Sequence, residues 1–282
     1  MNPIKVMVNG IPGNMAQTVA GHVLKDKRFQ LVPFSLTGPE ITAPRQVVAA
    51  TAVGLIRPNT REEAIASIKA KEGSFISVDF THPAAVQANA EFYCRHRLPF
   101  VMGTTGGDRS LLEKLVTASA VSAVIAPNMA KQIVGFQAMM EYTAASYAGL
   151  FEGYTLQIRE SHQQGKADTS GTAKAMVRYF NALGTPFSED GIIKERDPKT
   201  QHEQWGIPKE YLGGHAWHTY TLDSPDKTVR FQFSHNVNGR EIYALGTLDA
   251  VAYLHRKVEE NSRGKVYSMI DVLSERKSSI TI

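Results

Sequence analysis

The chain has 282 residues, 43% of them hydrophobic and 21% charged, and its formal net charge is +4. This composition is that of a globular protein with one large domain or two smaller ones, and no apolar stretch approaches the roughly 20 residues of a membrane span. Lysine and arginine are scattered along the chain and form no basic block. We therefore expect small anionic ligands, and neither a nucleic-acid nor a membrane partner.

The number of cysteines and the N-terminal sequence indicate whether the protein binds a metal and where in the cell it is expected. Cys94 is the only cysteine, which excludes a disulfide scaffold and a cysteine-based metal site, and we expect no bound metal. A strand pattern begins within three residues of the N-terminus, so we expect no signal or transit peptide in this sequence. The expected location is the cytoplasm, or the plastid stroma if a transit peptide has been removed.

The first elements predict a dinucleotide-binding turn. Ile4–Val8 reads as a short strand, and residues 9–16 (NGIPGNMA) follow it and lead into an apolar pattern at helical spacing. Gly10 permits a tight turn there, and Gly13 lets the backbone approach a pyrophosphate. Strand, glycine turn and helix together indicate the first unit of a nucleotide-binding sheet.

The end of the next strand indicates which nicotinamide cofactor is used. Phe29–Leu36 reads as the second strand, and NAD-selective folds place an Asp or Glu at its end to bind the adenosine ribose. This chain has Ser35 and Thr37 there, whose hydroxyls can hydrogen-bond a 2′-phosphate. We therefore expect NADPH to be preferred over NADH, with Arg45 as a candidate counter-ion, unless Glu40 supplies the missing carboxylate.

Further strands end in polar loops. Phe75–Thr81 and Pro99–Met102 read as buried strands, and Gly103–Gly106 (GTTG) follows the second of them. Ala120–Pro127 looks like another strand. Because strand ends in a doubly wound sheet face the ligand crevice, we expect residues 79–81 (DFT) and the GTTG loop to contact the cofactor.

A strand, loop and helix in the middle of the chain form the candidate catalytic site. Gly153–Arg159 alternates apolar and polar residues, as a half-buried strand does, and apolar residues recur at helical spacing from Ala173 to Leu183. The loop between them carries His162 and Lys166, and Ser170–Thr172 lies at the amides of the helix N-terminus. Taken singly, these residues are equally well a surface histidine, a solvated charge and a helix cap. Together they can bind an anion and supply a proton.

The remaining elements predict a second, mixed domain. A long helix beginning at Lys131 leads into it, and strands at Trp217–Leu222 and Thr228–Val237 predict a largely antiparallel sheet with one helical layer. Residues from Ala244 to Lys257 are helical, and we expect Ser274–Ile282 to be frayed.

The stretch Glu160–Ala175 (ESHQQGKADTSGTAKA) resembles the signature of the 4-hydroxy-tetrahydrodipicolinate reductase (dihydrodipicolinate reductase) family. Bacterial members of that family read roughly E-x-H-H-x-x-K-x-D-A-P-S-G-T-A. Gln163 replaces the second histidine here, and Asp168–Ser170 replaces the D-A-P-S run, so the sequence is closer to the plant-type branch. The family pattern leaves open how the second substrate carboxylate is bound.

Other segments carry the same resemblance. They are the glycine turn, the DFT and GTTG loops, Ala126–Met129, Gly213–Trp217 (GGHAW), Arg240 and the closing motif Tyr267–Leu273 (YSMIDVL). The resemblance runs from Ile4 to about Leu273 and is weakest in residues 37–73 and 185–213. His215 and His218, in or next to the GGHAW segment, could serve the site or be structural.

The resemblance implies an α/β fold with two domains. We expect a Rossmann-type parallel-sheet domain of residues 1–130 and 241–282, which binds the dinucleotide. Residues 131–240 then form a smaller α+β domain with a mostly antiparallel sheet, which binds the substrate or mediates oligomerisation. The expected partners are a dicarboxylate substrate and further copies of the chain, in a dimer or tetramer.

The implied activity is NADPH- or NADH-dependent reduction of the dihydrodipicolinate-type substrate in lysine and diaminopimelate biosynthesis. Hydride addition to the conjugated imine leaves an enamine that must be protonated. His162 is then the general acid, for which an ordinary histidine pKa of about 6.5 is suitable. Lys166 stabilises charge and binds a substrate carboxylate. The other expected substrate-binding residues are Gln163, Ser170, Gly171 and Thr172.

The expected cofactor-binding residues are Gly10, Gly13, Asn14, Met15, Ser35, Thr37, Asp79, Phe80, Thr81, Gly103, Thr104, Thr105, Pro127, Asn128, Met129 and Arg240. Two other functions fit the same pattern. One is a different NADP-dependent dehydrogenase that acts on an imine of an amino acid. The other is a catalytically silent NADPH sensor, against which the presence of both His162 and Lys166 argues.

Overall fold

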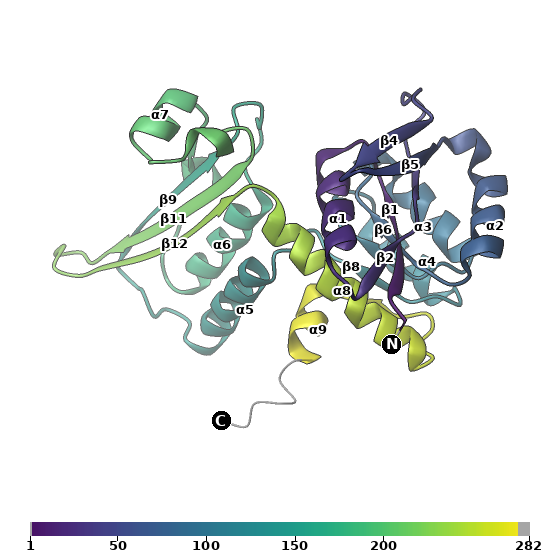
Figure 1. The fold of residues 1–282 in the computed structure, drawn as a ribbon. Coiled ribbons are helices and arrows are strands. Elements are labelled where there is room, and N and C mark those ends of the chain that lie inside the picture. Colours follow the sequence, from purple (N-terminus) through teal and green to yellow (C-terminus); the bar gives the residue numbers. More distant parts are fainter. Residues whose placement is uncertain (1, 276–282) are drawn as a thin grey trace. The chain divides into compact units, whose positions relative to one another are not determined.

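A computed structural model describes residues 2–275 and divides into two compact units (Figure 1). The first consists of the described residues up to Lys131 and those from Glu241 onward, and the second is Gln132–Arg240. Within residues 2–275, no helix is long and apolar enough to cross a membrane. The expectation of a frayed end falls mostly on residues 276–282, which lie outside the described residues.

A six-stranded parallel sheet forms the centre of the first unit, in the strand order β13-β8-β7-β6-β1-β2. Its strands are β1 (Ile4–Asn9), β2 (Phe29–Leu31), β6 (Ile76–Asp79), β7 (Phe100–Met102), β8 (Ala123–Ile125) and β13 (Val266–Tyr267). The helices of this unit are α1 (Asn14–Lys25), α2 (Arg61–Glu72), α3 (Val86–Arg95), α4 (Arg109–Thr117), α8 (Glu241–Glu259) and α9 (Met269–Ser274), with 3-10 turns η1 (Pro58–Thr60) and η2 (Pro83–Ala85). The expected Rossmann-type sheet is confirmed.

Both faces of this sheet are buried, as the apolar strands require. Val6, Met7 and Val8 are successive residues of β1, so they point to alternate faces, and none of them is exposed. Each such side chain contributes about 1.5–3 kcal/mol of hydrophobic stabilisation. The strands therefore form a rigid platform for the loops at their carboxyl ends.

The prediction of one strand over Phe29–Leu36 is wrong. The segment forms β2 and a separate strand β3 (Phe34–Leu36), and Pro33 between them has no amide hydrogen to donate to a ladder. β3 joins a three-stranded sheet, in the order β3-β5-β4, with β4 (Arg45–Val48) and β5 (Thr51–Ile56). β4, β5 and α2 lie in residues 37–73, where the sequence predicted no elements.

A four-stranded sheet in the order β10-β9-β11-β12 forms the second unit. Its strands are β9 (Thr155–His162), β10 (Ile193–Glu195), β11 (His215–Asp223) and β12 (Arg230–Asn238). Only the β10–β9 pair is parallel, so the expected mostly antiparallel sheet is confirmed. The helices are α5 (Lys131–Ser146), α6 (Gly171–Ala182) and α7 (Pro198–Glu203), with 3-10 turns η3 (Glu189–Gly191) and η4 (Lys209–Tyr211).

The register of this sheet gathers polar side chains on its buried face. His218 of β11 lies directly opposite Glu160 of β9 on one side and His235 of β12 on the other. The next row on the same face is apolar and contains Ile158 and Tyr220, both with no exposed surface. A row with one carboxylate and two imidazoles therefore sits at the edge of a hydrophobic core.

Candidate active site

Helix α6 begins where the loop after β9 ends, and its first turn offers an anion site. Ser170 is the N-cap, and its Oγ accepts a hydrogen bond from the Ala173 amide at 3.1 Å. The amides of Gly171 and Thr172 have no acceptor within the helix, and the helix dipole favours negative charge beside them. Gly171 is exposed and Thr172 half-buried, so a ligand can reach both amides.

Glu160 is a fixed, buried carboxylate behind this helix start. Its Oε1 lies 2.5 Å from Nη2 of Arg196, and its Oε2 accepts the Ser170 amide at 3.1 Å. Burial opposes its ionisation, but hydrogen bonds from His218, Arg196 and Ser170 outweigh burial and lower the pKa of Glu160. The residue therefore stays charged and holds the start of α6 in place.

His162 and His218 lie on either side of the Glu160 carboxylate. Their ring centroids are 5.1 Å apart, and the Nε2 atoms of His162 and His218 lie 3.8 Å and 3.6 Å from Glu160 Oε2. His218 Nε2 is also 2.8 Å from the Ser170 hydroxyl. Nε2 of His162 has no hydrogen-bond partner among the described residues, although only 7% of the residue is exposed.

The expectation of an ordinary pKa for His162 is wrong for the ligand-free protein. Burial disfavours the charged ring, and the neighbouring His218, Arg196 and Lys166 act in the same direction. Glu160 opposes them only in part, so the pKa of His162 falls to about 3. The ring is neutral near pH 7 until a ligand changes the local charge.

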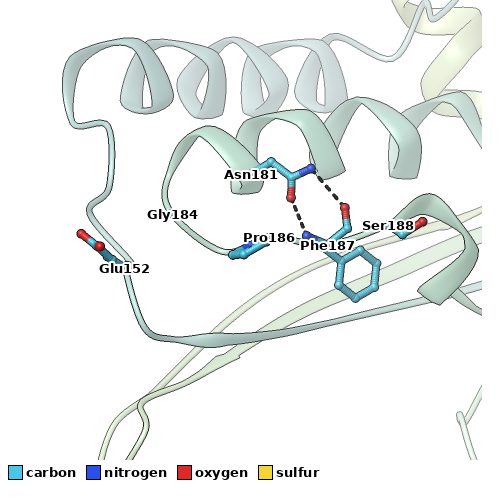
Figure 2. Close-up of a pocket in the computed structure, with 6 residues that line it drawn as sticks. All are labelled: Glu152, Asn181, Gly184, Pro186, Phe187 and Ser188. Atoms are coloured by element: carbon cyan, nitrogen blue, oxygen red, sulfur yellow. Dashed lines mark hydrogen bonds between the residues drawn. The ribbon is translucent and has the colours of Figure 1, made fainter.

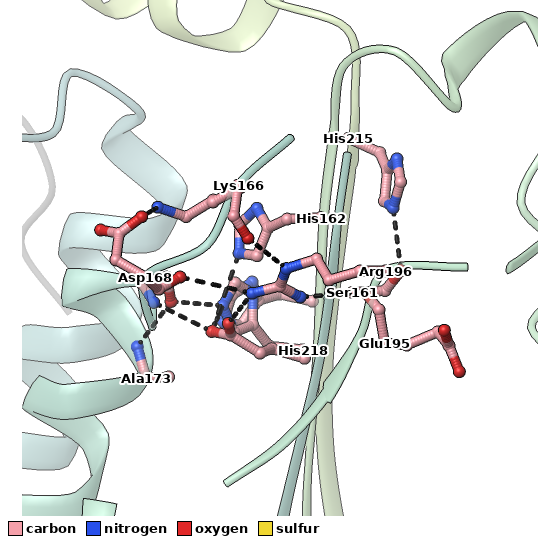
Figure 3. Close-up of polar contacts among 12 residues, drawn as sticks. Ser161, His162, Lys166, Asp168, Ala173, Glu195, Arg196, His215 and His218 are labelled. Carbon is pink, nitrogen blue, oxygen red and sulfur yellow. Dashed lines mark hydrogen bonds and ion pairs between the residues drawn. The ribbon is translucent and has the colours of Figure 1, made fainter. Parts of the chain in front are cut away.

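The loop between β9 and α6 is held by two residues that the sequence did not single out. Arg196, just after β10, donates from Nε to the Lys166 carbonyl at 2.8 Å, as well as to Glu160 (Figure 3). Gln201 of α7 donates to the His162 carbonyl at 2.7 Å. Both belong to residues 185–213, and no sequence spacing links them to the loop, because only the pairing of β10 with β9 brings them there.

Lys166 is close enough to His162 to contribute to the lowering of its pKa, and its side chain extends toward Asp168 (Figure 3). Nζ of Lys166 is 2.7 Å from Oδ1 of Asp168, whose side chain is 78% exposed. Gln163 and Lys166 are half-buried, and the Gln163 carbonyl accepts the Lys166 amide at 3.0 Å. The end of β9 at His162, the loop with Gln163 and Lys166, and the start of α6 thus follow one another within one short stretch of chain.

The two histidines that the sequence left open have different positions. His215 Nε2 is 2.9 Å from Ser161 Oγ, and its Nδ1 is 3.1 Å from the Tyr211 carbonyl. Ser161 and His162 are consecutive strand residues and face opposite sides of the sheet. His215 is therefore outside the cluster of Glu160, His162 and His218, whereas His218 is part of it.

This cluster also has the composition of a metal site. Glu160, His162 and His218 are buried and each offers a ligand atom, and these atoms lie within 4.8 Å of one another. However, the guanidinium of Arg196 already pairs with the Glu160 carboxylate and neutralises its charge. A divalent cation bound at this cluster would be repelled by that guanidinium. We therefore assign the cluster to proton handling and not to a metal.

The first unit has a cavity of about 900 Å³ at the glycine turn. Gly10 lines it with φ of +106°, and a Cβ at this position would collide with the Phe80 carbonyl. A Cβ on Gly13 would lie 2.8 Å from the Gly10 carbonyl oxygen. Only glycine fits this turn, and the first turn of α1 begins beside it at Asn14 and Met15. The cavity, the turn and the helix start fit a dinucleotide.

The side of this cavity next to Thr37 carries a positive charge that the sequence did not identify. Thr37, Glu40 and Arg61 line it, whereas Arg45 is exposed on β4 and is not among the lining residues. The Arg61 guanidinium lies 4.7 Å from the centroid of the Phe92 ring, which fixes its direction. The Ser35 hydroxyl was expected to bind a 2′-phosphate. In the structure Ser35 is fully buried, and its Oγ accepts the Ile11 amide at 3.1 Å.

Asp79 has no exposed surface, and hydrogen bonds surround its carboxylate. Oδ1 accepts from the Thr81 amide at 3.1 Å and from the Thr104 hydroxyl at 2.6 Å. Oδ2 accepts from Tyr93 at 2.7 Å and from Asn89 at 3.0 Å. The carboxylate therefore connects the DFT loop to the GTTG loop.

Some of the other residues expected to bind the cofactor line the cavity, and others do not. Phe80 and Thr81 line the cavity, whereas Gly103, Thr104, Thr105, Pro127, Asn128 and Met129 are not among its lining residues. Asn128 caps the turn before α5 by accepting the Ala130 amide at 2.9 Å, and Met129 is 2% exposed. Arg240 belongs to the second unit, where its guanidinium lies beside Gly214.

A shallow hollow after α6 offers no comparable chemistry (Figure 2). Its volume is about 740 Å³, and it is lined by Glu152, Asn181, Gly184, Pro186, Phe187 and Ser188. The Asn181 amide is engaged at both ends by the Phe187 backbone, at 2.7 Å and 3.1 Å. We therefore place no site there.

Comparison with known proteins gives matches over nearly the whole chain. The family described as dihydrodipicolinate reductase, N-terminus, matches residues 4–129, and its C-terminal counterpart matches residues 135–273. A probable chloroplastic 4-hydroxy-tetrahydrodipicolinate reductase 2 of Oryza sativa subsp. japonica is 46% identical over 96% of this chain and 83% of its own length. The chloroplastic enzyme 2 of Arabidopsis thaliana is 45% identical over 97% of this chain and 78% of its own length.

A solved structure has the same fold. It is a dipicolinate-bound dihydrodipicolinate reductase from Paenisporosarcina sp. TG-14, with a TM-score of 0.64 and 19% sequence identity. The superposition covers 94% of this chain and 97% of that one.

Proposed function

This chain belongs to the dihydrodipicolinate reductase family, and we propose that it is a 4-hydroxy-tetrahydrodipicolinate reductase of lysine and diaminopimelate biosynthesis. The observation that carries the proposal is the placement of His162 at the end of β9 and of Lys166 on the loop that follows, which leads into the open amides of α6. That loop can hold a dicarboxylate and deliver a proton to it. The loop departs from the family signature at the second histidine, which Gln163 replaces, and in the run Asp168–Ser170.

In this assignment the two units have separate tasks. The first unit binds the nicotinamide cofactor in the cavity beside Gly10 and Gly13, and the second binds the substrate and mediates oligomerisation. When bound, NADPH or NADH supplies the hydride. Ser35 and Asp79 have positioning roles, because their side chains are buried and already hydrogen-bonded. Asn128 and Arg240 remain proposed cofactor contacts on the family pattern.

The residues of the substrate loop perform the rest of the reaction. One substrate carboxylate lies against the Gly171 and Thr172 amides and the Thr172 hydroxyl, and Lys166 pairs with it. Gln163 can donate a hydrogen bond to the second carboxylate. After hydride addition the substrate carries an enamine, and Nε2 of His162 donates the proton that completes the product.

The cofactor preferred in this proposal is NADPH. Arg61 supplies a guanidinium on the adenosine side of the cavity, and the Thr37 hydroxyl adds a hydrogen-bond donor. Glu40 also lines the cavity and provides an acceptor for ribose hydroxyls, which keeps NADH usable. The expected order of catalytic efficiency is therefore NADPH above NADH.

We also assign the outer face of the second unit's sheet to assembly with a further copy of the chain. Helices α5 and α6 pack on the inner face, and the outer face has a polar hollow of about 470 Å³ that is lined by Gln157, Arg159, Thr219, Asp223, Arg230 and other residues of the three long strands. Charges of both signs allow such a face to pair with its own copy about a twofold axis. Light scattering should give a dimer or tetramer, and Thr219→Arg should shift it toward a monomer; a monomeric unmodified protein would contradict the assignment.

The test of the proposed activity is spectrophotometric. Substrate generated in place by the preceding synthase should cause oxidation of NADPH, followed at 340 nm, and the rate should depend on both substrate and enzyme. An imine of another amino acid, offered in place of this substrate, should give no oxidation. Tight NADPH binding without substrate-dependent oxidation would identify a sensor and reject the reductase.

A further inference from the structure

The charges around His162 are balanced before any ligand binds. Lys166 pairs with Asp168 at 2.7 Å, and Arg196 pairs with Glu160 at 2.5 Å, so each pair is formally neutral. Burying further charge without compensation is costly. A dicarboxylate brings two negative charges into a site that offers no net positive charge.

One of the two pairs can open and the other cannot. Asp168 is 78% exposed and remains solvated alone, so Lys166 can leave it and neutralise one ligand carboxylate. Glu160 has no exposed surface, so Arg196 must stay with it. One negative charge of the ligand is then left without a partner, and a proton is the remaining means of compensation.

Imidazoles are the groups in this region that can accept that proton. His162 and His218 lie 3.8 Å and 3.6 Å from the same oxygen of Glu160, and His235 stacks on His218 with ring centroids 4.6 Å apart. The other facing groups cannot accept it near neutral pH. Burial raises the pKa of Tyr220, and the residues that contribute from α5 and α7 are the uncharged Phe136 and Gln201.

We propose that a dicarboxylate ligand draws one proton from solvent into the cluster of Glu160, His162 and His218, so that substrate binding itself loads the general acid. This inference rests on the proposed function. Three buried histidine ring nitrogens have no hydrogen-bond partner among the described residues: His162 Nε2, His218 Nδ1 and His235 Nδ1. Nε2 of His162 is the receiving atom, because it lies 3.8 Å from the Glu160 carboxylate and His162 is next to the substrate loop. His218 is a positioning residue that holds the Ser170 cap and shares the Glu160 carboxylate with His162.

The same charges explain why the proton arrives only with the ligand. In the ligand-free site, burial and the nearby positive groups lower the pKa of His162 to about 3. Each neighbouring negative charge raises the pKa of a titrating group by about one to three units, and a dianion brings two such charges. A bound dianion therefore favours the imidazolium, and its departure as product favours the neutral ring.

The proton balance of one turnover then closes. Binding of the dianion takes up one proton from solvent, which forms the N–H bond at His162 Nε2. Hydride addition forms one C–H bond on the substrate, and breaking the N–H bond of His162 forms the second, on the enamine carbon. The ring returns to neutral, and reduction has consumed one hydride and one proton.

Calorimetry with pyridine-2,6-dicarboxylate tests this directly. The protein saturated with NADPH is titrated at pH 6.0 in cacodylate, MES and Bis-Tris, whose ionisation enthalpies differ. The slope of the binding enthalpy against buffer ionisation enthalpy should give an uptake of about one proton per site. His162→Gln should abolish the uptake while it retains hydrogen bonding, and His218→Gln should reduce it. His215→Gln, on the opposite face of the sheet, should leave it unchanged.

A slope of zero in the unmodified protein, with tight binding, would overturn the inference. Equal uptake in the unmodified protein and His162→Gln would also overturn it, and circular dichroism shows whether each variant is folded. Neither result tests the proposed reductase activity, because the 340 nm assay of the unmodified protein tests that activity separately. Activity without proton uptake rejects only the loading of the acid, whereas absence of activity rejects the proposed function.

Discussion

The carboxylate of Glu160 lies 2.5 Å from the guanidinium of Arg196, and the carboxylate has no exposed surface. The pair joins β9 to the residue that follows β10, and the same guanidinium donates to the carbonyl of Lys166 at 2.8 Å. One side chain therefore both compensates a buried charge and fixes the loop that carries the candidate catalytic residues. The shape of the substrate loop depends on this ion pair.

Removal of Arg196 should damage stability and ligand binding together. Arg196→Gln leaves Glu160 buried and unpaired, which typically costs about 3–5 kcal/mol. Urea denaturation measures this cost, and the inhibition constant of pyridine-2,6-dicarboxylate should rise in the same variant. Arg95→Gln is the control, because Arg95 is 61% exposed in its pair with Glu62 and the loss should be below about 1 kcal/mol. Equal losses in the two variants would contradict the role given to Arg196.

Lys166 should bind the dicarboxylate. Lys166→Ala removes a charge next to the start of α6, so we expect a sharp rise in the inhibition constant of pyridine-2,6-dicarboxylate against substrate. For the unmodified protein the inhibition should be competitive and should weaken as salt screens the pair. Lys174→Ala is the matched control, since Lys174 lies on α6 but is 48% exposed and pairs with Glu189. If Lys166→Ala left the constant unchanged, the anion site would lie elsewhere.

Arg61 should favour NADPH. Arg61→Ala should raise KM for NADPH and leave KM for NADH nearly unchanged, because only NADPH carries the 2′-phosphate. Thr37→Asp should shift the preference toward NADH by repelling that phosphate. Arg45→Ala should change neither constant, since Arg45 does not line the cavity. The preference is wrong if the unmodified protein uses NADH at least as efficiently, and the assignment of Arg61 is wrong if its removal affects both cofactors equally.

Local patterns predicted the parts of the site that lie within one stretch of chain. The glycine turn at Gly10 and the loop from His162 to Thr172 follow from residue types at fixed spacings, so the sequence was sufficient for them. The sequence could not show whether His215 or His218 belongs to the site. A strand pattern places residues three apart on opposite faces, but it does not show which face is buried. That choice depends on the pairing of β11 with β9.

Residues that act across long separations could not be predicted. Arg196 contacts Glu160 although the two are 36 residues apart in the sequence, and Gln201 contacts His162 although they are 39 residues apart. Arg61 enters the nucleotide cavity only because β3 leaves the main sheet at Pro33 to join another one. The low pKa of His162 likewise depends on its burial and neighbours, which no local pattern contains.

Buried histidines should make the second unit sensitive to acid. Burial is the main cause that lowers the pKa of His235 to about 3, whereas an unfolded histidine has a pKa of about 6.5. Between these two values the unfolded chain binds a proton that the folded chain does not, so stability falls as pH falls from about 6.5 toward 3. His235→Gln should reduce the slope of unfolding free energy against pH by about 1.4 kcal/mol per unit at pH 4–6. An unchanged slope in urea titrations would show that His235 titrates normally when folded.

The measurement that tests the account most directly is the turnover of His162→Gln together with its affinity for NADPH. Positioned proton transfer is worth about 10²–10⁴ in rate, so kcat should fall by that factor while the Kd for NADPH stays the same, because His162 belongs to the substrate unit. His215→Gln should behave like the unmodified protein in both measurements. If His162→Gln turns over the substrate as fast as the unmodified protein, His162 is not the acid and the proposed mechanism is wrong.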